Sequence, residues 1–145
     1  MKNKGQDKDC QCPIRTKIPA FSAKLTQPQT PGRNGVIKFD KIVTNIQNGY
    51  NPTTGIFTAP VAGVYLFSYT VVSAAGKYLH VYLSHNNTKQ QTTWMKGSQY
   101  ETGTADIILI LKKGDQVAVK VHGSNTVYSD GRNLFSSFSG FLIAQ

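Results

Sequence analysis

The feature that most constrains this chain is a long uncharged window from Ile42 to Gly76. It contains no Asp, Glu, Lys, Arg or His, although the rest of the 145-residue sequence carries 16 basic and 7 acidic side chains. Such a window is expected to be buried. Turn residues divide it into short extended pieces, and the piece from Val64 to Val72 is rich in β-branched and aromatic residues without helical spacing. The window therefore predicts the central strands of an all-β domain.

Further short segments of β character flank this window. They span residues 20–25, 36–39, 42–46, 78–84, 89–94, 101–111, 117–121 and 134–143. Nine or ten strands without a convincing helix are typical of a two-sheet sandwich of the jelly-roll kind. A chain of this size buries very roughly 70% of its unfolded surface, enough for a core without metal or disulfide. We predict one all-β jelly-roll domain over residues 19–145, preceded by a flexible basic segment over residues 1–18.

Some predicted strands carry apolar residues on both faces. The run from Ile107 to Leu111 has no polar position, and Val64 and Leu66 alternate with the aromatic residues of their strand. One sandwich core uses only one face of each sheet, so a surplus on the other face predicts a subunit interface.

The chain is basic, with a formal net charge of +9 that is unevenly distributed. Residues 1–41 hold nine Lys and Arg against three Asp, whereas residues 42–145 hold seven against four. A basic protein favours anionic partners such as acidic glycans, lipopolysaccharide or nucleic acid. The alternative is a basic tail that only aids solubility. Nucleic acid is the weakest of these predictions, and it requires binding that falls steeply with salt.

The N-terminal region has no apolar signal sequence, and its cysteines are isolated. The first residues are polar, so the protein is either intracellular or written without a removed leader. No apolar run approaches the roughly 20 residues of a membrane helix, so we expect no membrane insertion. Cys10 and Cys12 have no further ligand near them for a metal site. They either form intermolecular disulfides in an oxidising compartment or have no role in the fold.

Several spaced blocks, in the right order, resemble the globular head of the complement C1q family, within the wider C1q/TNF superfamily. They include Ile37-Lys38-Phe39-Asp40, Thr54-Gly55-Ile56-Phe57-Thr58-Ala59-Pro60, Gly63-Val64-Tyr65-Leu66-Phe67-Ser68, Lys113-Gly114-Asp115 and Ser137-Phe138-Ser139-Gly140-Phe141. The resemblance covers residues 19–144 and implies a ten-stranded jelly roll that forms a homotrimer. It also implies a secreted, non-catalytic recognition protein, which favours a removed leader.

Two departures from the complement chains narrow the resemblance. Ala59 stands where those chains often carry cysteine, and no Gly-X-Y collagen tract precedes the head. The block around Tyr50 and Thr54 is most similar to head-only, lectin-like members from bivalve molluscs. This implies innate-immune pattern recognition of microbial or anionic glycans. The alternative is a cytokine-like or structural trimer that engages a protein receptor or matrix.

The polar loop from Gly123 to Asn133 is the first candidate for ligand binding. It combines donors, acceptors, an aromatic ring and both charge signs, a mixture suited to polar ligands. Tyr128 would stack on a sugar ring and Arg132 would pair with a carboxylate or phosphate. The same loop is also consistent with an ordinary solvated connection. The remaining candidates are Asn125, Asp130, Asn133 and the bordering His122, with Trp94 and Lys112 outside the loop.

Metal, modification and catalytic motifs are sparse. No cofactor is required by the sequence, but the resemblance implies that Asp130 contributes to a calcium site near a threefold axis, completed by carbonyls and water. Asn86-Asn87-Thr88 is a glycosylation sequon in a predicted turn. The three histidines show no metal-protease spacing, and no nucleophile elbow is present. We therefore expect a binding protein and not an enzyme.

Overall fold

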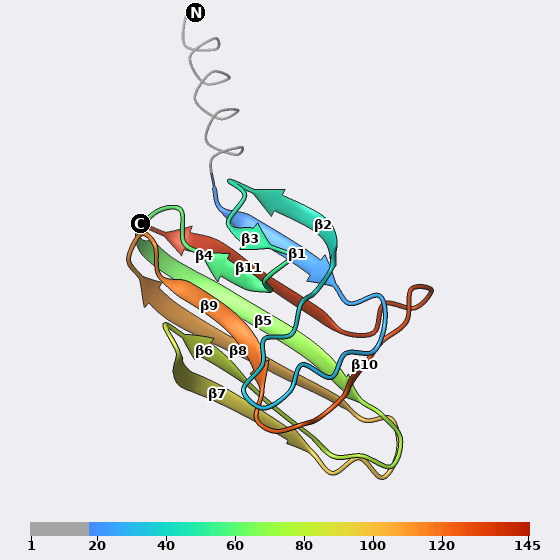
Figure 1. Ribbon diagram of the computed structural model, residues 1–145. Helices are drawn as coiled ribbons and strands as arrows, with labels where there is room; N and C mark the ends of the chain where they lie inside the picture. The colour runs from blue at the N-terminus through green and yellow to red at the C-terminus, as the bar shows by residue number, and fades with distance from the viewer. Residues whose placement is uncertain (1–17) are drawn as a thin grey trace, which may run out of the picture.

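The computed structural model describes residues 18–145, and in this range it contains strands and no helix (Figure 1). The strands are β1 (Ala20–Lys24), β2 (Lys41–Ile46), β3 (Tyr50–Asn51), β4 (Ile56–Thr58), β5 (Gly63–Ser73), β6 (Leu79–His85), β7 (Thr88–Met95), β8 (Thr102–Leu111), β9 (Gln116–Val121), β10 (Val127–Tyr128) and β11 (Ser137–Ala144). Accordingly, no helix long and apolar enough to cross a membrane occurs among these residues.

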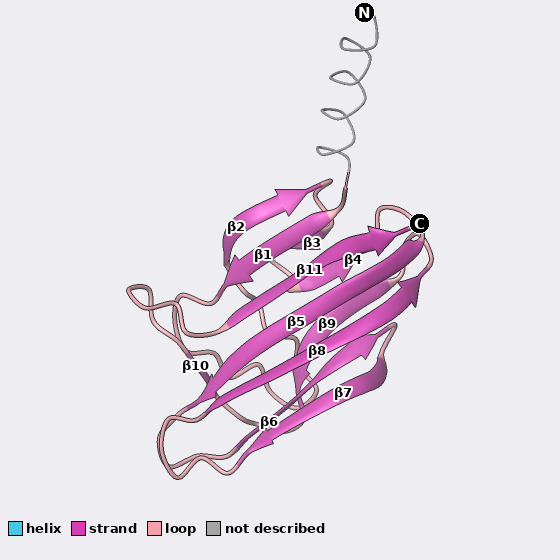
Figure 2. Cartoon of the chain, turned by 180° about the vertical axis from the view of Figure 1, so that it is seen from behind, coloured by secondary structure: helices cyan, strands magenta, loops and turns pink. Residues whose placement is uncertain are grey.

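The strands form two antiparallel sheets that pack face to face. In sheet A, β5 pairs with β8 on one side and with β11 and β10 on the other, and β1 and β2 continue from β11 (Figure 2). In sheet B the order is β3-β4-β9-β6-β7. Most neighbours are far apart in sequence, as in a jelly roll. The predicted all-β sandwich is confirmed; two strands of two residues each bring the count to eleven.

An aromatic cluster joins the two sheets. Strict alternation along β5 turns Tyr65, Phe67 and Tyr69 inward, where each is at most 1% exposed. Phe21 of sheet A stacks on Tyr50 and Phe57 of sheet B with ring centroids 5.0 Å apart in both pairs. Fully burying a phenylalanine stabilises a fold by about 1.5–3 kcal/mol. This cluster therefore holds the two sheets in one unit.

Two glycines mark places where the backbone or a ring comes too close for a side chain. Gly55 has φ +77° and lies against the carbonyl of Ile37, so it closes the predicted turn in a conformation that favours glycine. A Cβ on Gly140 would lie 2.5 Å from the ring of Phe67 and 2.9 Å from that of Phe21. The glycine of β11 thus makes room for the aromatic core.

The structure differs from the prediction at two segments. The pattern over residues 36–39 predicts a strand, but only Val36 makes an isolated bridge, to Lys120. Phe39 is instead held by the hydroxyl of Tyr50, which accepts from its N–H at 2.9 Å and donates to its carbonyl at 3.0 Å. The last strand begins at Ser137 and not at Leu134, because Leu134 adopts a positive φ of 53°.

Candidate ligand-binding site

The predicted ligand loop is pinned at its centre and divides into two parts. Val127 is fully buried and forms a bridge to Gln29, with backbone hydrogen bonds of 2.8 and 3.0 Å. Val127 and Tyr128 also pair with Ser73 and Val72 at the end of β5. The residues before Val127 therefore line one pocket and those after it line another, so the loop is not a single continuous site.

The first pocket, here called the aromatic pocket, has a volume of about 450 Å³. It is lined by Val72, Tyr100, Thr102, Tyr128, Asp130, Asn133 and Phe135. The Tyr128 ring lies 4.8 Å from that of Tyr100 and 5.9 Å from that of Phe135, centroid to centroid. Tyr100 and Phe135 are both exposed. Exposed rings beside polar groups suit the packing of a ligand that has one apolar and one polar face.

Asp130 organises its own loop. Its Oδ1 accepts from the N–H groups of Arg132 and Asn133 at 3.0 and 2.6 Å, and its Oδ2 accepts from Asn133 Nδ2 at 3.2 Å. These hydrogen bonds, led by the Asn133 backbone N–H, hold the pKa of Asp130 below its usual value of 3.8. Asp130 is therefore an ionised carboxylate that already accepts hydrogen bonds from its own loop. Arg132, two residues along, is exposed.

The calcium prediction for Asp130 stays a prediction. Within residues 18–145 no three His, Cys, Asp or Glu side chains of one chain come close enough to hold a metal ion. The threefold arrangement that the prediction requires adds ligands from other subunits and from water. The carboxylate of Asp130 would enter such a site already carrying three hydrogen bonds.

His122 and Asn125 lie with the other part of the loop. Asn125 is only 6% exposed, and its Oδ1 accepts from the N–H of His80 at 3.0 Å. His122 is exposed, and its ring stacks on that of His80 at 4.4 Å with the planes 7° apart. They adjoin a second, polar pocket of about 540 Å³ lined by Thr30, Gly76, Lys77, Tyr78, Ser124, Asn125 and Thr126. The six predicted residues thus fall into two groups.

Sequence reasoning missed several pocket residues. Tyr100 and Phe135 complete the aromatic pocket, and Tyr78 and His80 border the polar one. The sequence pattern places Phe135 in the last strand, which the structure does not. The pattern at Tyr78 and His80 does indicate an outward-facing aromatic row, but only the pairing of β6 with β9 brings His80 to His122.

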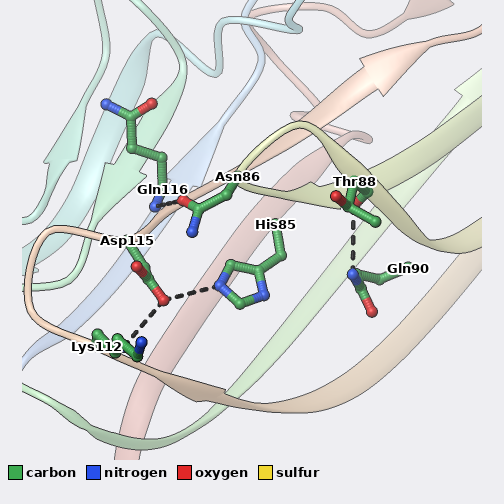
Figure 3. Close-up of polar contacts among 7 residues, drawn as sticks. All are labelled: His85, Asn86, Thr88, Gln90, Lys112, Asp115 and Gln116. Carbon is green, nitrogen blue, oxygen red and sulfur yellow. Dashed lines mark hydrogen bonds and ion pairs between the residues drawn. The ribbon is translucent and has the colours of Figure 1, made fainter.

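The glycosylation sequon lies in the exposed turn between β6 and β7. Asn86 has a positive φ of 49°, and its Oδ1 accepts from the N–H of Gln116 at 2.8 Å (Figure 3). Next to it, Asp115 Oδ2 accepts from the N–H of Lys112 at 3.0 Å and lies 2.9 Å from His85 Nε2. Asp115 thus holds the β8–β9 turn against the β6–β7 hairpin, as expected of a structural turn.

The outer face of sheet A has an apolar half at the end where β5 begins. Val64 lies opposite Ile110 and Leu66 opposite Ile108 on β8, and Leu66 also lies opposite Phe141 on β11. Ile108 and Ile110 are 61% and 78% exposed. The apolar surplus predicted for residues 107–111 is therefore present on the surface of the single chain.

The paired cysteines of the prediction, Cys10 and Cys12, lie outside the described residues.

Comparison with known proteins identifies relatives of this chain. Residues 20–143 match the family model of the C1q domain. The chain is 33% identical over 124 residues to a component chain of the complement C1q subcomponent of Mus musculus, and the match covers 85% of this chain and 49% of that protein. The chain thus spans about half the length of this curated relative.

Solved structures show the same fold at low sequence identity. The globular domain of a zebrafish complement 1qA protein gives a TM-score of 0.72 at 22% identity, covering 88% of this chain and 98% of that one. Murine APRIL gives 0.68 at 12% identity, covering 88% and 100%. The Eiger TNF of S. frugiperda gives 0.68 at 13% identity, covering 89% and 94%. Given the match of the family model over nearly all the described residues, the chain belongs to the C1q domain family.

Proposed function

We propose that this chain is a secreted, lectin-like recognition protein that acts as a homotrimer and binds microbial or anionic glycans. The observation that carries the proposal is the aromatic pocket, where the exposed Tyr100 and Phe135 and the half-buried Tyr128 stand beside the polar Asp130 and Asn133. Sugar rings present one apolar and one hydroxylated face, which such a lining matches. Members of the C1q and TNF families are non-enzymatic ligand-binding proteins, in agreement with a binding role.

The apolar half of the sheet A face supports the trimer. Val64, Leu66, Ile108, Ile110 and Phe141 form a contiguous apolar surface across β8, β5 and β11. Contiguous apolar surface of this kind is typical of interfaces between copies of a chain. Val72 and Thr102 lie on the same face, roughly 20 Å farther along the strands at about 3.3 Å per residue. The aromatic pocket therefore lies on the same face as the apolar half but at the other end of the strands, so a trimer built through that half would carry three such pockets at one end.

Weak sites at one end of a trimer gain strength from simultaneous binding. Three pockets held by one assembly can engage a repetitive surface with an avidity 10²–10⁴-fold above a single site, by the usual order of magnitude. This favours repetitive microbial glycans over a single free sugar. It also accounts for shallow pockets in place of one deep cavity.

The test is binding of the purified trimer to neutral, sialylated, sulfated and lipopolysaccharide-type glycans at physiological salt, with calcium and with chelator. We expect a defined subset of positives. Tyr128→Ala and Arg132→Ala should each lower affinity by about tenfold while leaving the trimer intact. Lys41→Ala, an exposed charge on β2, is the matched control. Loss with chelator would support a calcium role for Asp130.

Two results would contradict the proposal. Binding unchanged in both loop variants would remove the aromatic pocket as the site. A blank array together with saturable, protease-sensitive binding to host cells would instead support a cytokine-like trimer that engages a protein receptor.

A further inference from the structure

The outer face of sheet B has a chemistry that the proposed function does not use. The strands of this sheet contain no Asp or Glu, but they carry Lys89 and Lys120, and His122 directly follows β9. We call the exposed part of this surface around His80, His122, Trp94 and Lys89 the imidazole face. Figure 1 shows its strands β9, β6 and β7 side by side. The side chains on the strands of this face that carry or gain charge near neutral pH are therefore all basic.

Three rings form a row across the neighbouring strands of this face. His122 donates its N–H to the carbonyl of His80 at 2.8 Å, and His80 lies opposite Trp94 on β7. The two imidazoles are stacked at 4.4 Å, and Trp94 is 60% exposed. Adjacent strands are separated by about 4.8 Å, so the row spans about 10 Å, long enough for more than one sugar ring.

Cations border this row on the side towards the β6–β7 turn. The Nζ of Lys89 lies 4.7 Å above the ring of Tyr82, and its charge acts on His80. Tyr82 lies opposite Lys120 and is fixed by a hydrogen bond of 3.0 Å from its hydroxyl to Asn34 Oδ1. A ligand on the ring row would thus meet positive charge along one edge.

The polar pocket borders the row on the opposite side. Asn125, which lines this pocket, accepts the N–H of His80, and Tyr78 lies two residues before His80 in the sequence. The pocket supplies the hydroxyl-bearing side chains of Thr30, Ser124 and Thr126 together with Lys77. Hydroxyls, an exposed tyrosine and a lysine can all bind the hydroxyl groups of a sugar.

The surroundings of His80 disfavour its protonated form when no ligand is bound. Burial, then the neighbouring His122 and Lys89, lower the pKa of His80. No carboxylate faces the pair from β6, β7, β9 or residues 122–126. An anionic group placed over the two rings would oppose this effect and favour the protonated form of His80.

We propose that the imidazole face is a second binding site, specific for an acidic saccharide. The carboxylate or sulfate group lies over His80 and His122, and a sugar ring packs on Trp94. The proposal rests on the proposed function for the class of ligand, but it uses a surface separate from the aromatic pocket. Because protonated imidazoles attract the acidic group, binding at this site tightens on acidification.

A saccharide fits this face better than a polynucleotide does. Binding along a phosphate backbone depends on a series of Lys and Arg contacts. Here Lys120 already donates to Asn87 Oδ1 at 2.9 Å and Lys89 is held over Tyr82. Apart from Lys77 at the polar pocket, the other groups named on this surface are rings, hydroxyls and the Asn125 amide. A polynucleotide is therefore an outcome that the experiment must separate.

The experiment measures equilibrium binding of three probes at fixed salt, at pH 7.5 and pH 5.5. The probes are a sulfated uronic acid–glucosamine hexasaccharide, its desulfated counterpart and a single-stranded DNA of equal charge. The sulfated probe should bind at least about tenfold more tightly than the other two, and about tenfold more tightly at pH 5.5 than at pH 7.5.

Variants assign the effect to this face. The double substitution His80→Asn and His122→Asn should abolish the gain on acidification, because asparagine keeps polarity without titrating. Trp94→Ala should weaken binding by about tenfold at both pH values. Lys41→Ala should change neither. All of these side chains except His80 are exposed, and the backbone N–H of His80 still binds Asn125, so thermal melts should match the wild type.

The inference is overturned if the double variant keeps the pH effect, if Trp94→Ala binds normally, or if DNA binds as tightly as the hexasaccharide. Its failure differs from that of the proposed function. If only Tyr128→Ala and Arg132→Ala lower glycan binding, the aromatic pocket stands and the imidazole face is wrong. If only the His80, His122 and Trp94 variants lower glycan binding, the imidazole face stands and the aromatic pocket is wrong.

Discussion

The outer faces of the two sheets are built by the same alternation but carry opposite chemistry. On sheet A, Ile108 and Ile110 project from β8 beside Val64 and Leu66 of β5 and form an uncharged apolar half. On sheet B, the corresponding outward positions are His80, Tyr82, Trp94, Lys120 and the adjoining His122. Both sheets turn their other face into one aromatic core. Neither outer face is therefore needed to hold the sandwich together.

This difference indicates separate tasks for the two faces. Covering the apolar half of sheet A with another copy removes hydrophobic surface from water without burying a charge. Covering the sheet B face in the same way would bury lysines and imidazoles on strands that carry no Asp or Glu, which is costly. We infer that subunits meet on sheet A and that sheet B stays open to solvent and to polar ligands.

The largest expected effect comes from the core that both faces share. Phe21→Ala removes a ring that stacks on Tyr50 and Phe57 and meets Phe138 edge-on at 4.9 Å. A cavity of this kind costs about 3–5 kcal/mol in the free energy of unfolding. Urea denaturation followed by Trp94 fluorescence and by circular dichroism should show one coincident, destabilised transition. Separate transitions would mean that the two sheets do not share one core.

A charge on the apolar half of sheet A should break the trimer and leave the fold intact. Ile110→Lys places an ammonium group where the proposed interface excludes water, so the trimer dissociation constant should rise by about a hundredfold or more. Analytical ultracentrifugation measures this directly. The matched control is Thr92→Lys, at an exposed position on β7, which should leave assembly unchanged. A trimer that tolerates Ile110→Lys would move the interface elsewhere.

A smaller loss of stability is expected at residues 36–39, where the sequence pattern predicts a strand that does not form. Tyr50→Phe removes the hydroxyl that serves both the N–H and the carbonyl of Phe39. Two buried backbone groups lose a partner, which should cost about 1–3 kcal/mol in unfolding free energy. Burial raises the pKa of Tyr50, so the hydroxyl stays protonated and can donate. Chemical denaturation against wild type measures the loss, and no loss would mean that water replaces the hydroxyl.

The fold was accessible from the sequence because alternation is a local property. The uncharged window predicts the strand from Val64 to Val72, and the structure has β5 from Gly63 to Ser73. The segment 36–39 has the same alternation, with Ile37 and Phe39 fully buried. Its contact with β9 is limited to the Val36 bridge and to the Ile37 N–H, which donates to the carbonyl of Val119. Lys38 and Phe39 bond instead to the side chains of Gln29 and Tyr50. No local pattern distinguishes these two cases.

The candidate sites depended on contacts that are distant in sequence. The sequence predicts one polar loop over residues 123–133, but β10 lies within it, and the bridge between Gln29 and Val127 divides the loop between two pockets. The sequence predicts that Asn125 contacts the ligand, but its side chain is buried and accepts a hydrogen bond from the backbone N–H of His80. The stacking of His80 on His122 requires the register of β6 and β9. Tertiary pairing decides each of these positions.

The smallest expected effect is the loss of stability when one of two carboxylates, Asp115 or Asp130, is protonated. At Asp115, beside sheet B, hydrogen bonds from the Lys112 N–H and then from His85 lower the pKa from 3.8 to about 2. At Asp130, in the aromatic pocket, the pKa is also lowered, but every partner lies within three residues. Asp115 joins two hairpins, whereas Asp130 orders only its own loop. Protonation should therefore matter more at Asp115.

The sign of the effect follows from the lowered pKa values. A carboxylate that is more acidic when folded stabilises the protein above pH 3.8, and this contribution is lost as the pH falls towards 2. Asp115→Asn should lower the urea midpoint at pH 5 and flatten its fall between pH 4 and pH 2. Asp130→Asn should do the same more weakly, since its loop unfolds locally at little cost to the sandwich. An equal or larger effect of Asp130→Asn would show that the loop of the aromatic pocket is as integral to the fold as the turns that join its strands.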